Sequence, residues 1–572
     1  MYTKQVEFKQ KSNKNILVDD NIFTREKFKH DHLTFSGNGS IKLTTTGNPF
    51  IDDFASLSKY RVLRDPQDIF NTMEILWNKD RLLTLKETFY LRLITRDTRL
   101  LGVNKKIGVQ IGTGLKHEFI YRLMWIADKS PKVFVKNIYL MPTIGSWYDI
   151  FQLLRIYYSY SDKGNFPINE IYKFIYDNLE NSNEKDLIKK YLPTIKSKSH
   201  NKTMCNYINT MIGKHIAKDL YDTTNSLERY RQLKASGTTN SLERYRQLKA
   251  SGNAHEWEQK ISQQAYNQID FSKISGRALS LLTTSKFLEN HNLEGRFKDW
   301  ILKQPVAKFT GYPYELFGKS TDNDYKKTLI NKQFLTLINQ APKAKANFIG
   351  VVDTSGSMDF DVPGTNVTAK QIAFSMALYL SYIMEGQFSK TWLEFNSKVT
   401  IHSLQGKTPL EQFSNMNRAY YNGSTNFLGV AELFVALKKA NFYSDDKFPT
   451  GIVCFSDGEF DKSYSNCRTS YGTTLTTVDL FKDVLLKGGF SENFVNNFTI
   501  ILWDIPNSYY GVPTPKFESL ATDFNIFHMS GLDPAGLSFI LGTETKDKPM
   551  PRTPDELFET AMHQEILDKI KL

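Results

Sequence analysis

The chain has 572 residues, too many for one hydrophobic core and suited to two or three domains of ordinary size. Its three cysteines, Cys205, Cys454 and Cys467, have unrelated spacings, which excludes a disulfide framework or a cysteine zinc site. The N-terminus lacks a secretory apolar region and no apolar run is long enough to span a bilayer, so we expect no membrane association and a cytoplasmic location.

Charge divides the chain into a basic and an acidic part. The first 345 residues carry 55 lysines and arginines against 35 aspartates and glutamates, whereas residues 346–545 carry 13 against 20. A basic part of this kind is typical of domains that bind a polyanion, but it also serves solubility or docking on an acidic partner. Charge alone therefore leaves nucleic-acid binding open.

Helical periodicity dominates the chain after a polar start. Residues 1–55 are rich in turn formers, so we expect an N-terminal arm with at most a short hairpin. Over residues 56–345 apolar residues recur at the helical period, as in QDIFNTMEILWNK and LTLKETFYLRLITRDTR. Many short amphipathic helices favour an all-α stacked repeat, closed as a ring or open as a solenoid. Further helices are expected at 116–128, 148–160, 169–180, 184–191, 204–220, 274–290, 293–303 and 323–339.

One segment of the helical module is duplicated. TTNSLERYRQLKASG occurs twice in succession, filling residues 223–252. One interpretation of the repeat is functional: the duplication doubles a basic surface. We prefer the other, in which a tandem duplication lengthened a loop or helix, because such insertions are well tolerated.

At about residue 346 the pattern changes to alternating strands and helices. The strand candidates are apolar on both faces, as a mostly parallel sheet covered by helices on both sides requires. They are NFIGVVD, KTWLEFN, VTIHSL, TGIVCFS, FTIILWD and NIFHMS. We therefore predict a Rossmann-like α/β domain over 346–545, followed by a helical tail at 546–572.

Oxygen-bearing side chains stand at three strand ends or loops of this predicted domain. DTSGS supplies Asp353, Ser355 and Ser357, GSTN supplies Thr425, and SDGE supplies Asp457. Ligands of open α/β sheets gather beyond the carboxyl ends of the strands, so these side chains should meet. Hydroxyl and carboxylate oxygens suit Mg²⁺ or Mn²⁺. We expect the three hydroxyls to bind directly and the two carboxylates to bind directly or through water, with one position open to a partner's oxygen.

These three motifs resemble the metal-ion-dependent adhesion site of von Willebrand A domains. DTSGS, GSTN and SDGE occur in the order of that site, and the five liganding positions show no departure from it. For DTSGS alone, a serine-rich surface turn would be the simpler explanation. The three together imply that residues 346–545 form a von Willebrand A domain with a divalent metal.

The helical part carries a second resemblance. FYLR through TRD at 89–97 and GSWYD at 145–149 resemble the TROVE module of Ro-type RNA-binding proteins, in which a helical ring precedes a von Willebrand A domain. LERYRQL at 227–233 and residues 274–282 are similar to related uncharacterised viral and plant proteins, although the duplicated insert departs from their pattern. A viral protein, in the host cell or in the virion, is therefore included among our expectations.

The Ro-like resemblance implies RNA on a basic helical surface. Its candidate contacts are basic side chains, although an exposed lysine or arginine is usually only a solvated residue. Trp147, Trp125 and Phe89 could stack on bases, but core positions are the commoner role of such rings. The candidate basic residues are Lys105, Lys106, Lys116, Arg122, Arg229 and Arg244.

The motifs of common enzymes are missing from the sequence. The ten histidines form no HExxH or HxE…PCxxC motif, and neither GxSxG in a strand-turn-helix setting nor a Walker loop occurs. His402 and His528 fall in predicted strands and are interpreted as sheet residues.

We expect a non-catalytic, Ro-like RNA-binding protein. The alternative is a metal-dependent scaffold or virion protein whose ion captures an acidic side chain or a phosphate; a Mg²⁺-dependent nuclease is a third, less favoured reading.

Overall fold

The chain forms two compact units. The computed structural model describes residues 22–57, 64–93, 96–97, 109–110, 112–159, 164–181, 185–193, 204–221, 256–309, 311–318, 323–341, 347–418, 423–440, 444–461, 475–505, 516–541 and 551–572, apart from residues 37, 39, 364 and 533. The first unit, called the sheet unit, comprises residues 1–64 and 301–564. The second, called the helical unit, comprises residues 65–300 and 565–572.

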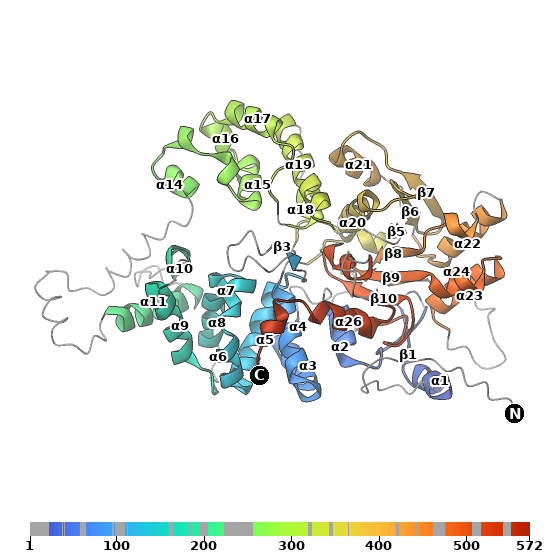
Figure 1. The fold of residues 1–572 in the computed structure, drawn as a ribbon, viewed down its shortest axis with the longest axis horizontal. Helices are drawn as coiled ribbons and strands as arrows, with labels where there is room; N and C mark the ends of the chain where they lie inside the picture. Colours follow the sequence, from blue (N-terminus) through green and yellow to red (C-terminus); the bar gives the residue numbers. More distant parts are fainter. Residues whose placement is uncertain are drawn as a thin grey trace, which may run out of the picture. The chain divides into compact units, whose positions relative to one another are not determined.

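A six-stranded sheet forms the centre of the sheet unit (Figure 1). Its order is β10-β9-β8-β5-β6-β7, and neighbouring strands are parallel except for the antiparallel pair β6 and β7. All six strands occur where the sequence predicted them. They are β5 (Phe348–Asp353), β6 (Thr391–Phe395), β7 (Val399–Ser403), β8 (Gly451–Ser456), β9 (Thr499–Asp504) and β10 (Ile526–Ser530).

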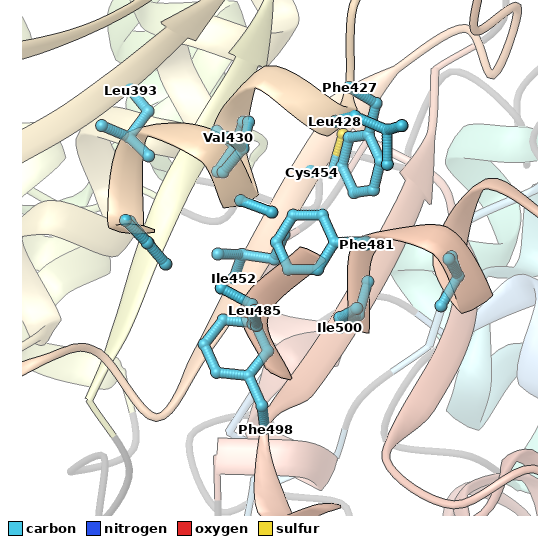
Figure 2. Close-up of a cluster of buried hydrophobic side chains, with 14 of the residues drawn as sticks. Leu393, Phe427, Leu428, Val430, Ile452, Cys454, Phe481, Leu485, Phe498 and Ile500 are labelled. Carbon is cyan, nitrogen blue, oxygen red and sulfur yellow. The ribbon is translucent and has the colours of Figure 1, made fainter. Parts of the chain in front are cut away.

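One face of the sheet is covered by α22 (Leu428–Lys439), α23 (Thr477–Lys487) and α24 (Glu492–Asn497). Alternate strand residues point to this face because side chains of a strand have a period of two. Ile452 and Ile500 therefore lie with Phe481 and Leu485 of α23 in one buried cluster (Figure 2). The ring centroids of Phe481 and Phe427 are 5.2 Å apart. Burial of these side chains fixes the helices on the sheet.

The opposite face packs against α20 (Ala369–Ile383). Gly350 of β5 permits the close approach, because a Cβ built there would lie 3.2 Å from the Cβ of Ala377. Phe374 of α20 meets Trp392 of β6 edge to face at 5.4 Å. Elements around this layer and in the sheet unit's loops are α18 (Pro313–Phe317), α19 (Asp324–Gln340), α21 (Pro409–Met416), η7 (Asp445–Lys447), η8 (Pro534–Leu537) and α25 (Ser538–Leu541).

The described N-terminal residues belong to the sheet unit. They form α1 (Ile22–Asp31), a hairpin of β1 (Leu33–Phe35) and β2 (Ile41–Leu43), and α2 (Pro49–Ser56). α2 packs on β10 and on α26 (Pro554–Met562), where the rings of Phe50 and Phe54 lie 5.6 and 5.4 Å from that of Phe558. The expected arm over residues 1–55 is therefore corrected for residues 22–55. The overall polar composition of this segment made it hard to recognise the short apolar face of α2, which packs on β10 and α26.

The other predicted boundaries, at 345 and 545, also need correction. Residues 301–341, where described, belong to the sheet unit, in which Phe317 stacks on Phe413 at 4.6 Å and Phe334 meets Tyr382 at 5.4 Å. The predicted tail divides, because α26 belongs to the sheet unit and residues 565–572 to the helical unit. Periodicity identified these helices, but it does not specify which surface buries their apolar side.

The described part of the helical unit is mostly helix, as predicted, with one antiparallel pair, β3 (Arg96–Asp97) and β4 (Val109–Gln110). The helix predicted at 274–290 is interrupted at residues 285–286, and the one predicted to include Ile94 ends at Arg92. Trp147 and Phe89 are buried, which confirms their core interpretation. The helices are α3 (Pro66–Lys79), α4 (Arg81–Arg92), α5 (Lys116–Lys129), α6 (Pro131–Asn137), α7 (Leu140–Ile144), α8 (Trp147–Ser159), α9 (Ile168–Asn181), α10 (Lys185–Tyr191), α11 (Met204–Tyr221), α14 (Glu256–Ser262), η4 (Tyr266–Gln268), η5 (Phe271–Lys273), α15 (Gly276–Thr284), α16 (Phe287–Asn290), α17 (Glu294–Lys303) and η9 (Leu567–Lys569).

Several predicted features lie outside the described residues. They include the duplicated segment at 223–252 and four of the six basic candidates, Lys105, Lys106, Arg229 and Arg244. Among the described helices, none is both long and apolar enough to cross a membrane.

Candidate metal site and basic surface

Asp353 is the central carboxylate of the candidate metal site. It ends β5 and is completely buried. Its Oδ1 accepts a hydrogen bond from the Ser355 N–H at 2.9 Å, and its Oδ2 accepts one from Ser456 Oγ at 2.6 Å. Burial, and secondarily the nearby Asp457 carboxylate, raise the pKa of Asp353 to about 7. An ionised Asp353 is therefore costly unless a cation lies beside it.

The two serines of the first motif lie next to each other. η6 (Gly356–Asp359) begins directly after Ser355, and the buried Met358 anchors this turn. The hydroxyl oxygens of Ser355 and Ser357 are 3.2 Å apart, within hydrogen-bond distance. Both hydroxyls are therefore available at one point just beyond the end of β5.

Thr425 is held beside the loop that follows β8. It is buried, its N–H donates to Asp461 Oδ2 at 2.7 Å, and its carbonyl accepts from the Asp461 N–H at 3.0 Å. The neighbouring Asn426 N–H donates to the carbonyl of Asn396, just after β6. These backbone bonds connect the loop before α22 to the ends of two strands.

Asp457 follows β8 at a tight turn. Gly458 has a φ of +78°, a backbone conformation that a side chain would disfavour. Its N–H donates to Ser456 Oγ at 3.0 Å, while the Glu459 N–H donates to Asp457 Oδ1 at 3.3 Å. The carboxylate of Asp457 is thus oriented by its own loop and lies close enough to Asp353 to affect its pKa.

The five predicted ligand residues therefore belong to loops that meet at the carboxyl edge of the sheet. The described residues contain no group of three or more His, Cys, Asp or Glu side chains that could hold a metal ion. The candidate ligands at this edge are two carboxylates and three hydroxyls, an all-oxygen set that fits Mg²⁺ or Mn²⁺. Burial and the nearby Asp457 both disfavour an ionised Asp353, and a bound proton or a cation would relieve this cost.

Two residues that support this site were missed by the sequence reasoning. Ser456 bonds the Asp353 carboxylate, and Asp461 bonds the backbone of Thr425. Asp461 stands four residues after Asp457, so its proximity was visible in the sequence. Its role was not, because its partner Thr425 lies 36 residues earlier.

The two histidines of the sheet have structural partners. His402 Nε2 lies 2.8 Å from Glu394 Oε2, and Glu394 also accepts from Thr354 Oγ1 at 3.0 Å. His528 Nε2 lies 2.8 Å from Ser519 Oγ. Both histidines are therefore satisfied sheet residues, as the sequence suggested.

Residues 347–564 match a family model described as Domain of unknown function (DUF7788). The chain is 23% identical over 442 residues to "Uncharacterized protein L728" of Acanthamoeba polyphaga mimivirus, covering 70% of this chain and 68% of the viral one. The crystal structure of the Deinococcus radiodurans RO (RSR) protein aligns with 78% of this chain and 88% of its own, at 13% identity and a TM-score of 0.38.

Lys116 is the one exposed RNA candidate among the described residues. It begins α5, and its Nζ lies 4.8 Å from the centre of the Tyr148 ring. The Arg155 guanidinium lies 5.1 Å from the same ring. Although Lys116 is exposed to solvent, desolvation of its ammonium group lowers its pKa, and among its neighbours Asp149 opposes this shift. Two cations therefore flank an aromatic ring in the helical unit.

Arg122 is a correction to the predicted RNA contacts. It is completely buried in α5, where its Nε donates to Glu118 Oε1 at 2.9 Å and its Nη1 lies 3.5 Å from Glu87 Oε2. The arginine thus faces the interior of the helical unit. A guanidinium in this position compensates buried carboxylates and does not reach a phosphate backbone.

Proposed function

We propose that the protein is a non-catalytic binding protein whose sheet unit is a von Willebrand A-type domain with one Mg²⁺ or Mn²⁺. The meeting of Asp353, Ser355, Ser357, Thr425 and Asp457 at the carboxyl edge of the sheet carries this proposal. Five protein oxygens leave one position of an octahedral ion to another oxygen. An acidic side chain or a phosphate of a partner has the chemistry to occupy it.

We expect Thr425→Val to weaken Mn²⁺ binding at least about tenfold. Valine keeps the shape of threonine and leaves both backbone bonds to Asp461 intact, but it removes the hydroxyl ligand. Titration calorimetry on the full chain measures the affinity, with exposed Thr400→Val on β7 as the matched control. Equal affinity in Thr425→Val would remove this residue from the site. Failure of the unaltered chain to bind Mn²⁺ or Mg²⁺ would refute the metal site.

We further propose that RNA of the Ro-like class binds to the helical unit. Residues 65–300 of this unit carry 36 lysines and arginines against 25 aspartates and glutamates, and Lys116 and Arg155 lie beside Tyr148. Both features support this proposal. Cations of this kind neutralise phosphates and release counterions. A helical repeat closed as a ring or open as a solenoid remains our prediction for this unit.

Lys116→Gln should weaken RNA binding across sequences and reduce the salt slope of log affinity by roughly one. Filter binding of single-stranded and structured RNA over a salt series measures both. Lys132→Gln, at another exposed lysine of the helical unit, is the control. Micromolar or weaker affinity that does not respond to salt would refute RNA binding.

The open metal position supports a second candidate, a scaffold that captures an acidic side chain of another protein chain. A pull-down in Mg²⁺ that recovers proteins without nucleic acid, and loses them in EDTA, would favour this scaffold. Partners that remain bound in EDTA would count against it.

A further inference from the structure

The loop that carries Asp457 is held from outside by the β1–β2 hairpin. Ser36 Oγ donates to the carbonyl of residue 460 at 2.8 Å, Asn38 Nδ2 donates to that of residue 459 at 2.6 Å, and Lys42 Nζ donates to that of residue 458. Three consecutive carbonyls thus receive hydrogen bonds from side chains that stand 416 to 424 residues earlier in the chain. We call Ser36, Asn38 and Lys42 the hairpin donors.

The hairpin itself is fixed to another part of the sheet unit. Leu43 and Phe517 exchange backbone hydrogen bonds of 2.7 and 2.8 Å. Beside this bridge, Lys42 pairs with the buried Glu518 at 3.3 Å. Ser36 Oγ also accepts the N–H of Ser40 at 2.9 Å, which holds the hairpin turn together. The hairpin donors therefore present a fixed row of groups to the loop.

Fixing three carbonyls determines how the peptide planes after Asp457 are oriented. The turn begins with Gly458 in the left-handed region, which glycine reaches because it has no Cβ, and glycine also has the most backbone freedom to lose. The Glu459 N–H in turn orients the Asp457 carboxylate. A loop without the hairpin donors would sample other orientations of these planes, and the carboxylate would sample them too.

We infer that the β1–β2 hairpin is a positioning element of the metal site, which sets its affinity for a divalent cation by fixing the loop at 457–461. The inference rests on the proposed metal site. Outer groups that orient metal ligands typically contribute 10- to 100-fold to affinity. The hydrogen bonds of the hairpin donors go to backbone carbonyls, so we expect these residues to act through the backbone of the loop.

Asn38→Ala is the sharpest test because it changes no charge and alters an exposed side chain. We expect Mn²⁺ affinity, measured by titration calorimetry on the full chain, to fall about tenfold. Amide hydrogen exchange of residues 457–461 without metal should become faster, while exchange in β9 should not change. The matched control is Asn415→Ala, since Asn415 is also exposed and its Nδ2 also donates to a loop carbonyl, that of Gln405, at 2.8 Å.

A second variant, Ser36→Ala, should lower the affinity in the same direction, because it removes a different bond to the same loop. Equal Mn²⁺ affinities of the unaltered chain, Asn38→Ala and Ser36→Ala would overturn the positioning role and leave the metal site standing. An equal loss in Asn415→Ala would also overturn it, since the effect would then not be specific to the hairpin. Absence of Mn²⁺ binding in the unaltered chain would instead refute both.

Discussion

We expect Asp353→Asn to abolish the proposed Mg²⁺ binding and to make the metal-free protein more stable at neutral pH. The raised pKa of Asp353 means that the folded chain holds this proton more tightly than the unfolded chain does. The proton on Asp353 therefore contributes to the stability of the unaltered, metal-free protein at low pH, and this contribution is lost as the pH rises from about 4 to about 7. Asparagine carries no such proton, so the stability of Asp353→Asn does not fall over this range. We expect a difference of about 1–3 kcal/mol in the free energy of unfolding at pH 8.

Chemical denaturation in EDTA at several pH values measures this difference. Excess Mg²⁺ should stabilise the unaltered protein and leave Asp353→Asn unchanged, because only a folded state that binds the ion gains from it. Asp483→Asn, at a half-buried carboxylate of α23 that pairs with Lys487, should behave like the unaltered chain in both respects. If Asp353→Asn is less stable than the unaltered chain in EDTA at pH 8, the raised pKa of Asp353 is contradicted. If Mg²⁺ stabilises both proteins equally, Asp353 is not a ligand of the ion.

The positions of the candidate ligands could be predicted because each depends on a short stretch of sequence. Asp353 and Asp457 directly follow buried strands, and parallel strands end at a common edge. The hairpin donors depend on contacts with residues more than 400 positions away, and nothing in FSGNGSIK indicates which carbonyls it meets. The local pattern therefore placed the candidate ligands at one edge of the sheet, whereas the residues that support them are brought there by tertiary contacts.

The burial of Arg122 could also have been predicted from local sequence, namely from the helical spacing of the apolar residues around it. Phe119, Leu123 and Ile126 are buried, and Arg122 lies among them at helical spacing, four residues after Glu118. The spacing therefore placed this arginine on the apolar side of α5. The Ro-like resemblance makes Arg122 a candidate RNA contact, whereas its position in the helix favours a buried ion pair.

Arg122→Met should destabilise the helical unit by about 3–5 kcal/mol, because it leaves the buried Glu87 and Glu118 without this counter-charge. Thermal denaturation followed by circular dichroism measures this decrease in stability, and limited proteolysis shows whether it lies in the helical unit. Adding Glu87→Gln and Glu118→Gln to Arg122→Met should recover much of the stability, since no uncompensated carboxylate then remains inside. A folded, fully stable Arg122→Met protein with weaker RNA binding would instead restore Arg122 as a nucleic-acid contact.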